Sequence, residues 1–248
     1  MAKQNIYDNE IFFEGYKKIR DNTYNANNLF EIPALISLLP DVKDKTILDL
    51  GCGFGEHCKL FVEKGAKKVV GLDISKKMIE KAKEENSSPK IEYVNLPMED
   101  MITLRQKFDI VVSSLAFHYI ESYKKLIEDI YSLLKVEGTL IFSQEHPFTT
   151  CHKSGERWTK NDEGIKIYAN ISNYSREGER DITWIVDNVK KYHRTFSTII
   201  NTLVEKGFRI EKIIEPIPDE DILKNHPEYT GLLHKPDFLL VKAVKVRK

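Results

Sequence analysis

The stretch Ile47-Leu-Asp-Leu-Gly-Cys-Gly-Phe-Gly-Glu-His57 decides the fold of this chain. An apolar run ends there in three glycines at alternate positions, Gly51, Gly53 and Gly55, and a helical pattern follows. Glycine lets a backbone turn sharply and approach a ligand without a clash from a Cβ atom. The stretch therefore predicts a strand, a ligand-binding loop and a helix, in that order.

Short apolar runs recur along the chain and alternate with patterns of helical period. In one such pattern, residues 123–134, apolar side chains return at spacings of three, four and seven. This alternation predicts an α/β fold with a doubly wound, mostly parallel, seven-stranded sheet and helices on both faces. The expected strands are Thr46–Leu50, Lys68–Leu72, Ile91–Asn95, Asp109–Ser113, Thr139–Ser143, Phe208–Ile214 and Phe238–Val244.

Composition excludes several classes of protein. Among the 248 residues, 38 basic and 38 acidic side chains balance, so bulk attraction to nucleic acid or to an anionic membrane is not expected. No apolar run approaches the roughly 18–20 residues of a membrane span, and the polar start lacks the apolar region of a signal peptide. The three cysteines show no CxxC spacing, which favours reduced thiols in a cytoplasmic protein.

The residues after the second strand indicate an adenosine ligand. Asp73 ends that strand about 20 residues after Gly51, where a carboxylate accepts hydrogen bonds from ribose hydroxyls. A dinucleotide site would use the same acid, but its loop reads GxGxxG. Here the third glycine position holds Glu56, which repels a pyrophosphate. Asp49 adds negative charge suited to a cationic ligand. The pattern favours an adenosine that carries an amino acid and a sulfonium over NAD.

Five motifs in order and spacing give the chain a family resemblance. ILDLGCGFGEH resembles the first motif of the class I S-adenosylmethionine-dependent methyltransferases, VVGLDIS (69–75) the second and NLPMEDM (95–101) the third. FDIVVSSLAFHYI (108–120) is similar to the fourth, and LLKVEGTLIFSQEHP (133–147) to the helix, turn and strand that close the core. The resemblance covers residues 46 to about 145. It implies a Rossmann-like fold with S-adenosylmethionine as cofactor and S-adenosylhomocysteine as its product.

The sequence pattern and this resemblance together predict four parts of the chain. Residues 1–45, with apolar side chains at helical spacing, are expected to form a helical lid, and residues 46–145 the cofactor-binding core. Residues 146–193 carry scattered aromatic and polar turn residues without helical period, and a stretch of this length is seldom bare loop. We expect a β-rich or mixed cap there, inserted after the fifth strand. Residues 194–248 return to the core sheet.

The resemblance also implies which residues contact the cofactor. The glycine loop would cradle the methionine moiety, and the acid at the end of the second strand would hold the ribose. The residue after this acid would pack on the adenine, the third motif would border the adenine, and the end of the fourth strand would face the sulfonium. In full, the expected cofactor residues are Asp49, Gly51, Cys52, Gly53, Asp73, Ile74, Met98, Glu99, Ser114 and Leu115. Asp49 can equally tie down the loop, and plain packing is an alternative role for Met98.

Three histidines are candidates for catalysis. Methyl transfer from a sulfonium needs chiefly an in-line arrangement with water excluded, and a general base only where the acceptor loses a proton. His118 follows the fourth strand, His146 the fifth, and His193 precedes the helix after the cap. Each of them can instead have a purely structural role. No metal site is expected, because no HxH or HxxxH spacing exists.

The sequence therefore predicts a methyltransferase that acts on a small molecule, with transfer to O, N or C left open. The fourth strand ends in Ser113-Ser-Leu-Ala116, unlike the Asn/Asp-Pro-Pro-aromatic tetrapeptide of many amino-directed DNA and protein methyltransferases. We expect no nucleic-acid partner, no membrane, and a monomer or homodimer. Two alternatives stay open: an NAD-linked oxidoreductase with a degenerate glycine loop, and a non-catalytic cofactor-binding module.

Overall fold

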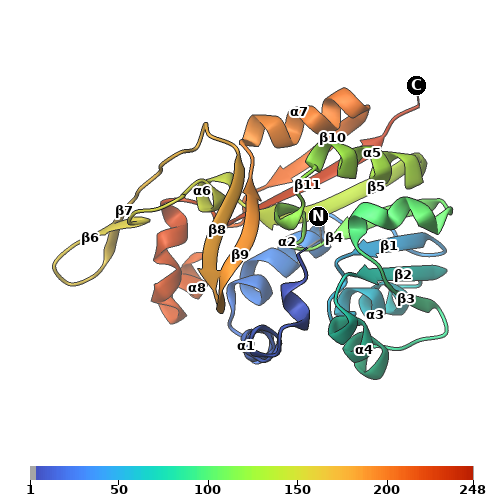
Figure 1. The fold of residues 1–248 in the computed structure, drawn as a ribbon, viewed down its shortest axis with the longest axis horizontal. Helices are drawn as coiled ribbons and strands as arrows, with labels where there is room; N and C mark the ends of the chain where they lie inside the picture. The colour runs from blue at the N-terminus through green and yellow to red at the C-terminus, as the bar shows by residue number, and fades with distance from the viewer. Residues whose placement is uncertain (1–3, 248) are drawn as a thin grey trace.

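In the computed structural model, which describes residues 4–247, seven strands form one sheet in the order β10-β11-β5-β4-β1-β2-β3 (Figure 1). Strands β1 to β5 pair in parallel, and β11 lies antiparallel between β5 and β10. The predicted α/β class and mostly parallel sheet are confirmed. The strands are β1 (Thr46–Leu50), β2 (Lys68–Asp73), β3 (Ile91–Asn95), β4 (Phe108–Ser113), β5 (Leu134–Glu145), β10 (Phe208–Ile214) and β11 (Phe238–Lys245).

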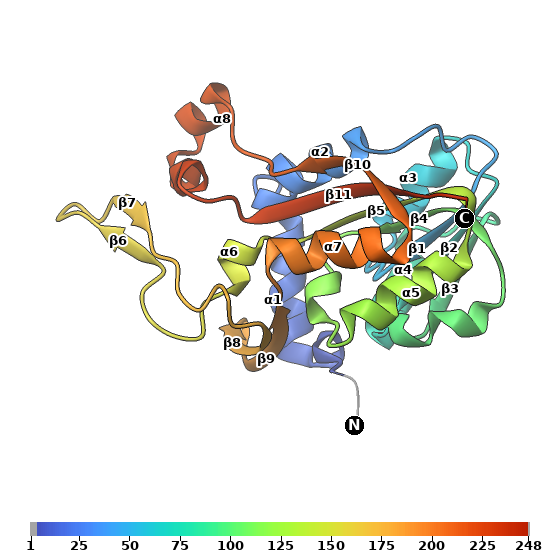
Figure 2. The ribbon, with the colours of Figure 1, turned by 90° about the horizontal axis from the view of Figure 1, so that it is seen from above.

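Helices cover both faces of this sheet (Figures 1 and 2). Along β1, Leu48 and Leu50 pack into the core cluster of one face and Ile47 into that of the other, all three without solvent exposure. A strand covered on both sides has to be apolar throughout, and its side chains alternate between the two cores. The first core is closed by α5 (Tyr123–Leu133), α7 (Phe196–Lys206) and η3 (Met98–Leu104), and the second by α2 (Ile32–Ser37), α3 (Glu56–Glu63) and α4 (Lys76–Glu85).

The chain order creates a crevice at the carboxyl edge of the sheet. From β1 the chain continues to β2 and β3 on one side, whereas β4 and β5 lie on the other side of β1. The loops that leave β1 and β4 therefore diverge, and open α/β sheets bind their ligands at such a point.

The N-terminal segment is tied to this edge by Asp8, which ends the short helix η1 (Ile6–Asp8). Its carboxylate accepts hydrogen bonds from Ser75 Oγ at 2.6 Å and from the backbone N–H of Lys77 at 3.1 Å. Both donors belong to the N-terminus of α4, where a negative charge is favoured. The helices that follow, α1 (Glu10–Asp21) and η2 (Asn27–Glu31), continue this N-terminal layer.

Two β-hairpins follow β5 and the short helix α6 (Pro147–Thr150). The hairpin of β6 (Trp158–Lys160) and β7 (Lys166–Ala169) projects away from the sheet, as Figures 1 and 2 show. The hairpin of β8 (Gly178–Trp184) and β9 (Val186–His193) instead packs against η4 (Phe117–Tyr119), which follows β4. The stretch is β-rich, while its boundaries as a separate cap stay a prediction. The remaining elements are α8 (Glu220–Asn225) and η5 (Pro227–Leu233).

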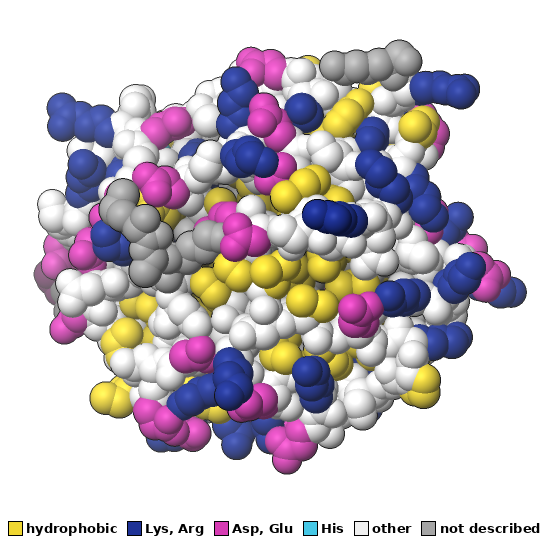
Figure 3. Space-filling model, turned by 45° about the vertical axis from the view of Figure 1, so that its right-hand side comes forward, with side chains coloured by type: hydrophobic (Ala, Val, Ile, Leu, Met, Phe, Trp, Pro, Cys, Tyr) yellow, Lys and Arg dark blue, Asp and Glu magenta, His cyan; other side chains and the backbone are white. Residues whose placement is uncertain are grey.

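The surface carries both signs of charge. On the face seen in Figure 3, Lys, Arg, Asp and Glu side chains are distributed around a central group of hydrophobic ones. Among residues 4–247, no helix combines the length and the apolar character that crossing a bilayer requires.

Candidate active site

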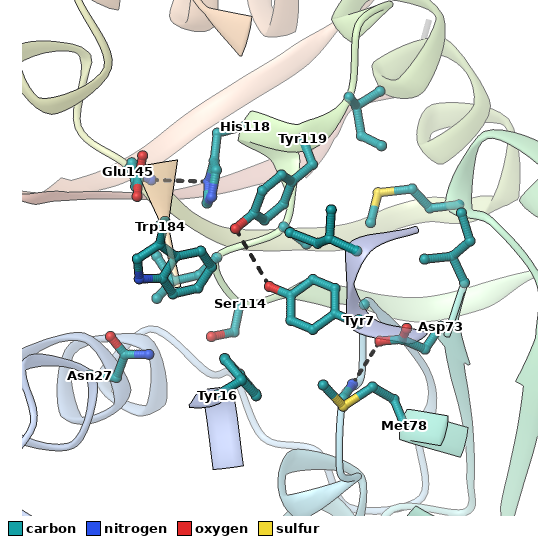
Figure 4. Close-up of a pocket in the computed structure, with 18 of the residues that line it drawn as sticks. Tyr7, Tyr16, Asn27, Asp73, Met78, Ser114, His118, Tyr119, Glu145 and Trp184 are labelled. Atoms are coloured by element: carbon teal, nitrogen blue, oxygen red, sulfur yellow. Dashed lines mark hydrogen bonds between the residues drawn. The ribbon is translucent and has the colours of Figure 1, made fainter. Parts of the chain in front are cut away.

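A cavity of about 360 Å³ lies at the carboxyl edge of the sheet (Figure 4). Its walls come from the N-terminal segment, from the loops after β1, β2 and β4, from the end of β5 and from β8. Eight of the ten expected cofactor residues are among the lining residues: Gly51, Gly53, Asp73, Ile74, Met98, Glu99, Ser114 and Leu115. Asp49 and Cys52 are not.

The glycine loop is closed onto β2 by its own backbone. The N–H groups of Gly51 and Cys52 both donate to Leu72 O, at 2.7 and 3.0 Å, and that of Gly53 donates to Asp73 Oδ2 at 3.0 Å. These N–H groups are therefore occupied within the protein and are not available to a pyrophosphate, which needs them as donors. This observation supports the sequence argument against a dinucleotide.

Two glycines of the loop are required by its shape. Gly51 has φ of +73°, and a Cβ there would lie 2.8 Å from Ala116 Cβ. Gly53 has φ of +52°, and a Cβ there would meet no atom within 4 Å. Because Gly53 lines the cavity, that open space belongs to the ligand.

Asp73 links the loop to the next helix. Its carboxylate accepts the N–H of Gly53 and, at 2.9 Å, that of Ser75. Burial raises the pKa of Asp73 to about 6, although these two N–H donors act to lower it. The side chain is 8% exposed and lines the cavity. A ribose placed there would find a carboxylate already oriented by two backbone donors.

Asp49 lies on the other side of the loop. It is 1% exposed and accepts a hydrogen bond from the thiol of Cys58 at 3.3 Å. Burial raises the pKa of Asp49 to about 7. This carboxyl group is outside the lining of the cavity, and its hydrogen bond is to α3, so its support of the loop stays a prediction. Cys52 is buried and borders a smaller pocket next to the loop.

That smaller pocket adjoins the main cavity, and Arg20 and Ser114 are among the residues that line both. Arg20, on α1, forms an ion pair with Glu56 at the start of α3, and its side chain is 14% exposed. Ser114 Oγ donates at 2.9 Å to Glu31, whose fully buried carboxyl group also accepts from Ser143 Oγ. No motif in the sequence points to Glu31, because only the folded chain brings η2 next to the end of β4.

Leu115 has an unusual backbone in this region. Its φ is +50°, a conformation that residues other than glycine rarely adopt. Its N–H group donates to the carbonyl oxygen of Ser143 at 3.1 Å and to its Oγ at 3.0 Å. Hydrogen bonds to β5 thus stabilise the turn after β4, and this turn leads into η4, which contains His118.

Among the three candidate histidines, His118 lines the cavity. Its Nδ1 accepts the backbone N–H of Glu145 at 3.3 Å. Burial lowers the pKa of His118 to about 3, and Lys191 and Arg194 act in the same direction. The ring is therefore neutral at ordinary pH and carries its proton on Nε2.

His146 and His193 lie outside the cavity lining. His146 caps α6, accepting the N–H of Phe148 at Nδ1 at 3.1 Å, and its Nε2 lies 2.8 Å from Glu215 Oε1. His193 Nδ1 lies 2.8 Å from Thr150 Oγ1, and its Nε2 lies 2.7 Å from the carbonyl oxygen of Tyr174. Both nitrogens of each ring thus serve structural hydrogen bonds, so we do not propose a catalytic role for either residue.

Aromatic side chains line the cavity. Tyr7, Tyr16 and Trp184 come from η1, α1 and β8, and Tyr119 comes from η4. The hydroxyl of Tyr7 donates to that of Tyr119 at 3.5 Å (Figure 4). Within residues 4–247, no group of three or more His, Cys, Asp or Glu side chains is placed to hold a metal ion.

Comparison with known proteins shows which protein family the chain belongs to. Residues 48–142 match the family model of the methyltransferase domain. A proposed S-adenosylmethionine-dependent methyltransferase from Listeria monocytogenes is 40% identical, with a TM-score of 0.81 over 88% of this chain and 97% of that chain. The chain belongs to the S-adenosylmethionine-dependent methyltransferases, and S-adenosylmethionine is its cofactor.

Two further relatives cover nearly the whole molecule. An uncharacterized protein from Haemophilus influenzae is 44% identical over 252 residues, which span 99% of each chain. An S-adenosylmethionine-dependent methyltransferase from Mesorhizobium loti is 35% identical, with a TM-score of 0.78 over 86% of this chain and 97% of that chain. The likeness therefore extends well beyond the five motifs.

The raised pKa of Asp73 makes a prediction about cofactor binding. A carboxylate binds ribose hydroxyls best when ionised, so affinity for S-adenosylhomocysteine should fall as pH falls through about 6. Between pH 7.5 and 5.0 we expect a loss of about tenfold, measured by calorimetry. Asp73→Asn should weaken binding and remove the pH step.

The control for this experiment is Asp49→Asn. Asp49 also has a raised pKa, of about 7, but lies outside the cavity lining. In this variant, affinity for S-adenosylhomocysteine should still fall as pH falls through about 6. If Asp73→Asn retained the step and Asp49→Asn lost it, the assignment of the ribose to Asp73 would be wrong.

Proposed function

We propose that this methyltransferase acts on a small molecule, which binds at the Trp184 end of the cavity and receives the methyl group by in-line displacement. The observation that carries the proposal is one continuous cavity with Asp73 and Met78 at one end and His118, Glu145 and Trp184 at the other (Figure 4). S-adenosylmethionine supplies an activated methyl group on a sulfonium. Among the groups at the far end, the carboxylate of Glu145 and the ring of His118 stand where an acceptor would meet it.

The lining residues suit the ribose, the adenine and the methionine moiety of S-adenosylmethionine. Asp73 would hold the ribose, and Ile74 and Met98 would lie against the adenine, with Glu99 at its edge. Arg20 would bind the carboxylate of the methionine moiety, since its guanidinium borders both the main cavity and the pocket beside the glycine loop. Glu56, its present partner, is half exposed and can turn to solvent.

The protein's contribution to the reaction is position and the exclusion of water. The aromatic wall and the N-terminal layer enclose the acceptor end, so this layer would serve as the lid. His118 would act as a hydrogen-bond donor through Nε2–H and not as a general base, because its Nδ1 already accepts the N–H of Glu145. His118 thus orients the acceptor without removing its proton.

The cavity, the surface charge and the cysteines support a small-molecule acceptor and a cytoplasmic location. The proposed acceptor end is part of a cavity of about 360 Å³, a volume that suits a small molecule, and Tyr7 and Trp184 are among its lining residues. The face in Figure 3 shows interspersed charges of both signs, without the basic stripe typical of nucleic-acid binding. Three buried cysteines are free thiols, as in proteins of reducing compartments.

Calorimetry with S-adenosylmethionine, S-adenosylhomocysteine and NAD tests the proposal. We expect dissociation constants of about 1–100 μM for the two sulfur ligands, and NAD at least about 100-fold weaker, because the loop N–H groups are occupied. A screen of small acceptors with methyl-labelled S-adenosylmethionine should then yield a labelled product. Tight binding of NAD alone, or labelling confined to protein or nucleic acid, would overturn the proposal.

A second variant tests how the cofactor is held. Arg20→Ala removes a charge-assisted partner of the methionine carboxylate, so affinity for S-adenosylhomocysteine should fall about 10–100-fold. Affinity for adenosine, which lacks that carboxylate, should stay unchanged. Lys18→Ala, on the exposed side of the same helix, is the matched control and should leave both ligands unaffected. Equal losses for both ligands would show that Arg20 acts only through the fold.

A further inference from the structure

The acceptor end of the cavity contains an unusual arrangement of charge. Glu145, at the end of β5, is the acidic residue that lines this end. Burial acts to raise the pKa of Glu145, but Lys191, together with His118 and Arg157, acts in the opposite direction, and the pKa lies below its ordinary value. An ionised carboxylate therefore faces the space where the methyl acceptor would bind.

Lys191 holds this carboxylate from behind. Its Nζ lies 2.5 Å from Glu145 Oε1, 4.9 Å from the ring centre of Trp184 and 5.7 Å from that of Tyr119. The side chain is 6% exposed and is not part of the cavity lining. The buried ammonium group of Lys191, on β9, thus contacts the side chains of Glu145, Trp184 and Tyr119 from outside the cavity. These three side chains line the acceptor end, and Lys191 does not.

His118 supplies the complementary hydrogen-bonding group. The N–H of Glu145 occupies Nδ1 of its ring, which leaves the proton on Nε2. In the part of the chain that the structure describes, no hydrogen bond is formed by Nε2 of His118, and this residue lines the cavity beside Glu145 (Figure 4). The acceptor end therefore presents one donor and one acceptor next to each other.

The charges at this end select against ions. Glu145 and Lys191 form an ion pair, and two further cations that act on Glu145 and His118, Arg157 and Arg194, are outside the cavity lining. The cation in the lining, Arg20, borders the pocket at the glycine loop. A carboxylate or phosphate would therefore face Glu145 without a cation in the lining at this end of the cavity. A cation would leave an unbalanced positive charge beside Lys191. A neutral acceptor meets neither penalty.

We propose that the acceptor end binds a neutral aromatic molecule through a hydroxyl group, which donates a hydrogen bond to Glu145 and accepts one from His118 Nε2. A hydroxyl does both at once, whereas an ether only accepts and an aromatic amine is a poor acceptor. The rings of Tyr7, Tyr119 and Trp184 line this space, and those of Tyr7 and Tyr119 are nearly perpendicular, at 86°, so an aromatic molecule can meet both a ring face and a ring edge there. Glu145 is the residue that sets this specificity, and Lys191 is a positioning residue.

This inference rests on the proposed function and can fail separately from it. The test measures binding of phenol, aniline, anisole and benzoate to the complex of the protein with S-adenosylhomocysteine, by saturation-transfer NMR. We expect phenol to bind about tenfold more tightly than anisole or benzoate, with aniline in between. Equal binding of phenol and benzoate, or no binding of phenol at millimolar concentration, would overturn the inference. Failure of S-adenosylhomocysteine to bind would instead contradict the proposed function.

Glu145→Gln tests the specificity directly, because it keeps the shape of the side chain and removes its charge. Benzoate should bind the variant about tenfold more tightly than the wild type, while affinity for S-adenosylhomocysteine stays within about twofold. Glu121→Gln makes the same change of net charge on an exposed side chain next to η4 and should leave the order of the four probes unchanged.

The single substitution leaves Lys191 buried without its partner, which can impair folding. The double variant Glu145→Gln/Lys191→Met removes both charges and keeps most of the volume. It should also bind benzoate more tightly than the wild type does. If both variants fold and still reject benzoate, Glu145 does not set the specificity.

Discussion

The carboxylate of Asp73 is the group on which the site depends. It accepts one N–H from the glycine loop, at Gly53, and another from Ser75, which begins α4. Two loops that belong to different strands are thereby fixed relative to each other, and Asp8 ties the N-terminal layer to the same helix through Ser75. The cavity exists because these three segments converge on one strand end. A buried carboxylate with a raised pKa is the electrostatic consequence of that convergence.

The core of the fold could be predicted from the sequence because its strands are covered on both faces. Buried parallel strands read as short apolar runs, and β1, which is buried from Ile47 to Leu50, begins and ends where its apolar run does. β5 extends further, from Leu134 to Glu145, because Leu134 pairs with Phe108 ahead of an irregularity in the register, next to which Glu137 has a positive φ of 60°. The pattern could not show that extension, since the polar residues before Thr139 lie at an exposed strand end.

Most of the predicted cofactor residues and His118 line the cavity, whereas the sequence did not point to Trp184 or Lys191. Gly51, Gly53 and Asp73 are fixed by local backbone geometry, which leaves a signature in the sequence. Trp184 and Lys191 come from a hairpin whose packing against η4 depends on long-range contacts, and neither has a local pattern. The role of His118 as a donor follows from a backbone N–H on another strand, which no sequence motif records.

A crystal structure of the complex with S-adenosylhomocysteine tests the account most directly, because it locates both ends of the ligand at once. The account predicts both ribose hydroxyls within hydrogen-bonding distance of Asp73, the methionine carboxylate at Arg20, and the sulfur atom turned towards His118 and Glu145. A ligand bound with its ribose away from Asp73, or with its sulfur turned away from Trp184, would contradict the division of the cavity into a cofactor end and an acceptor end.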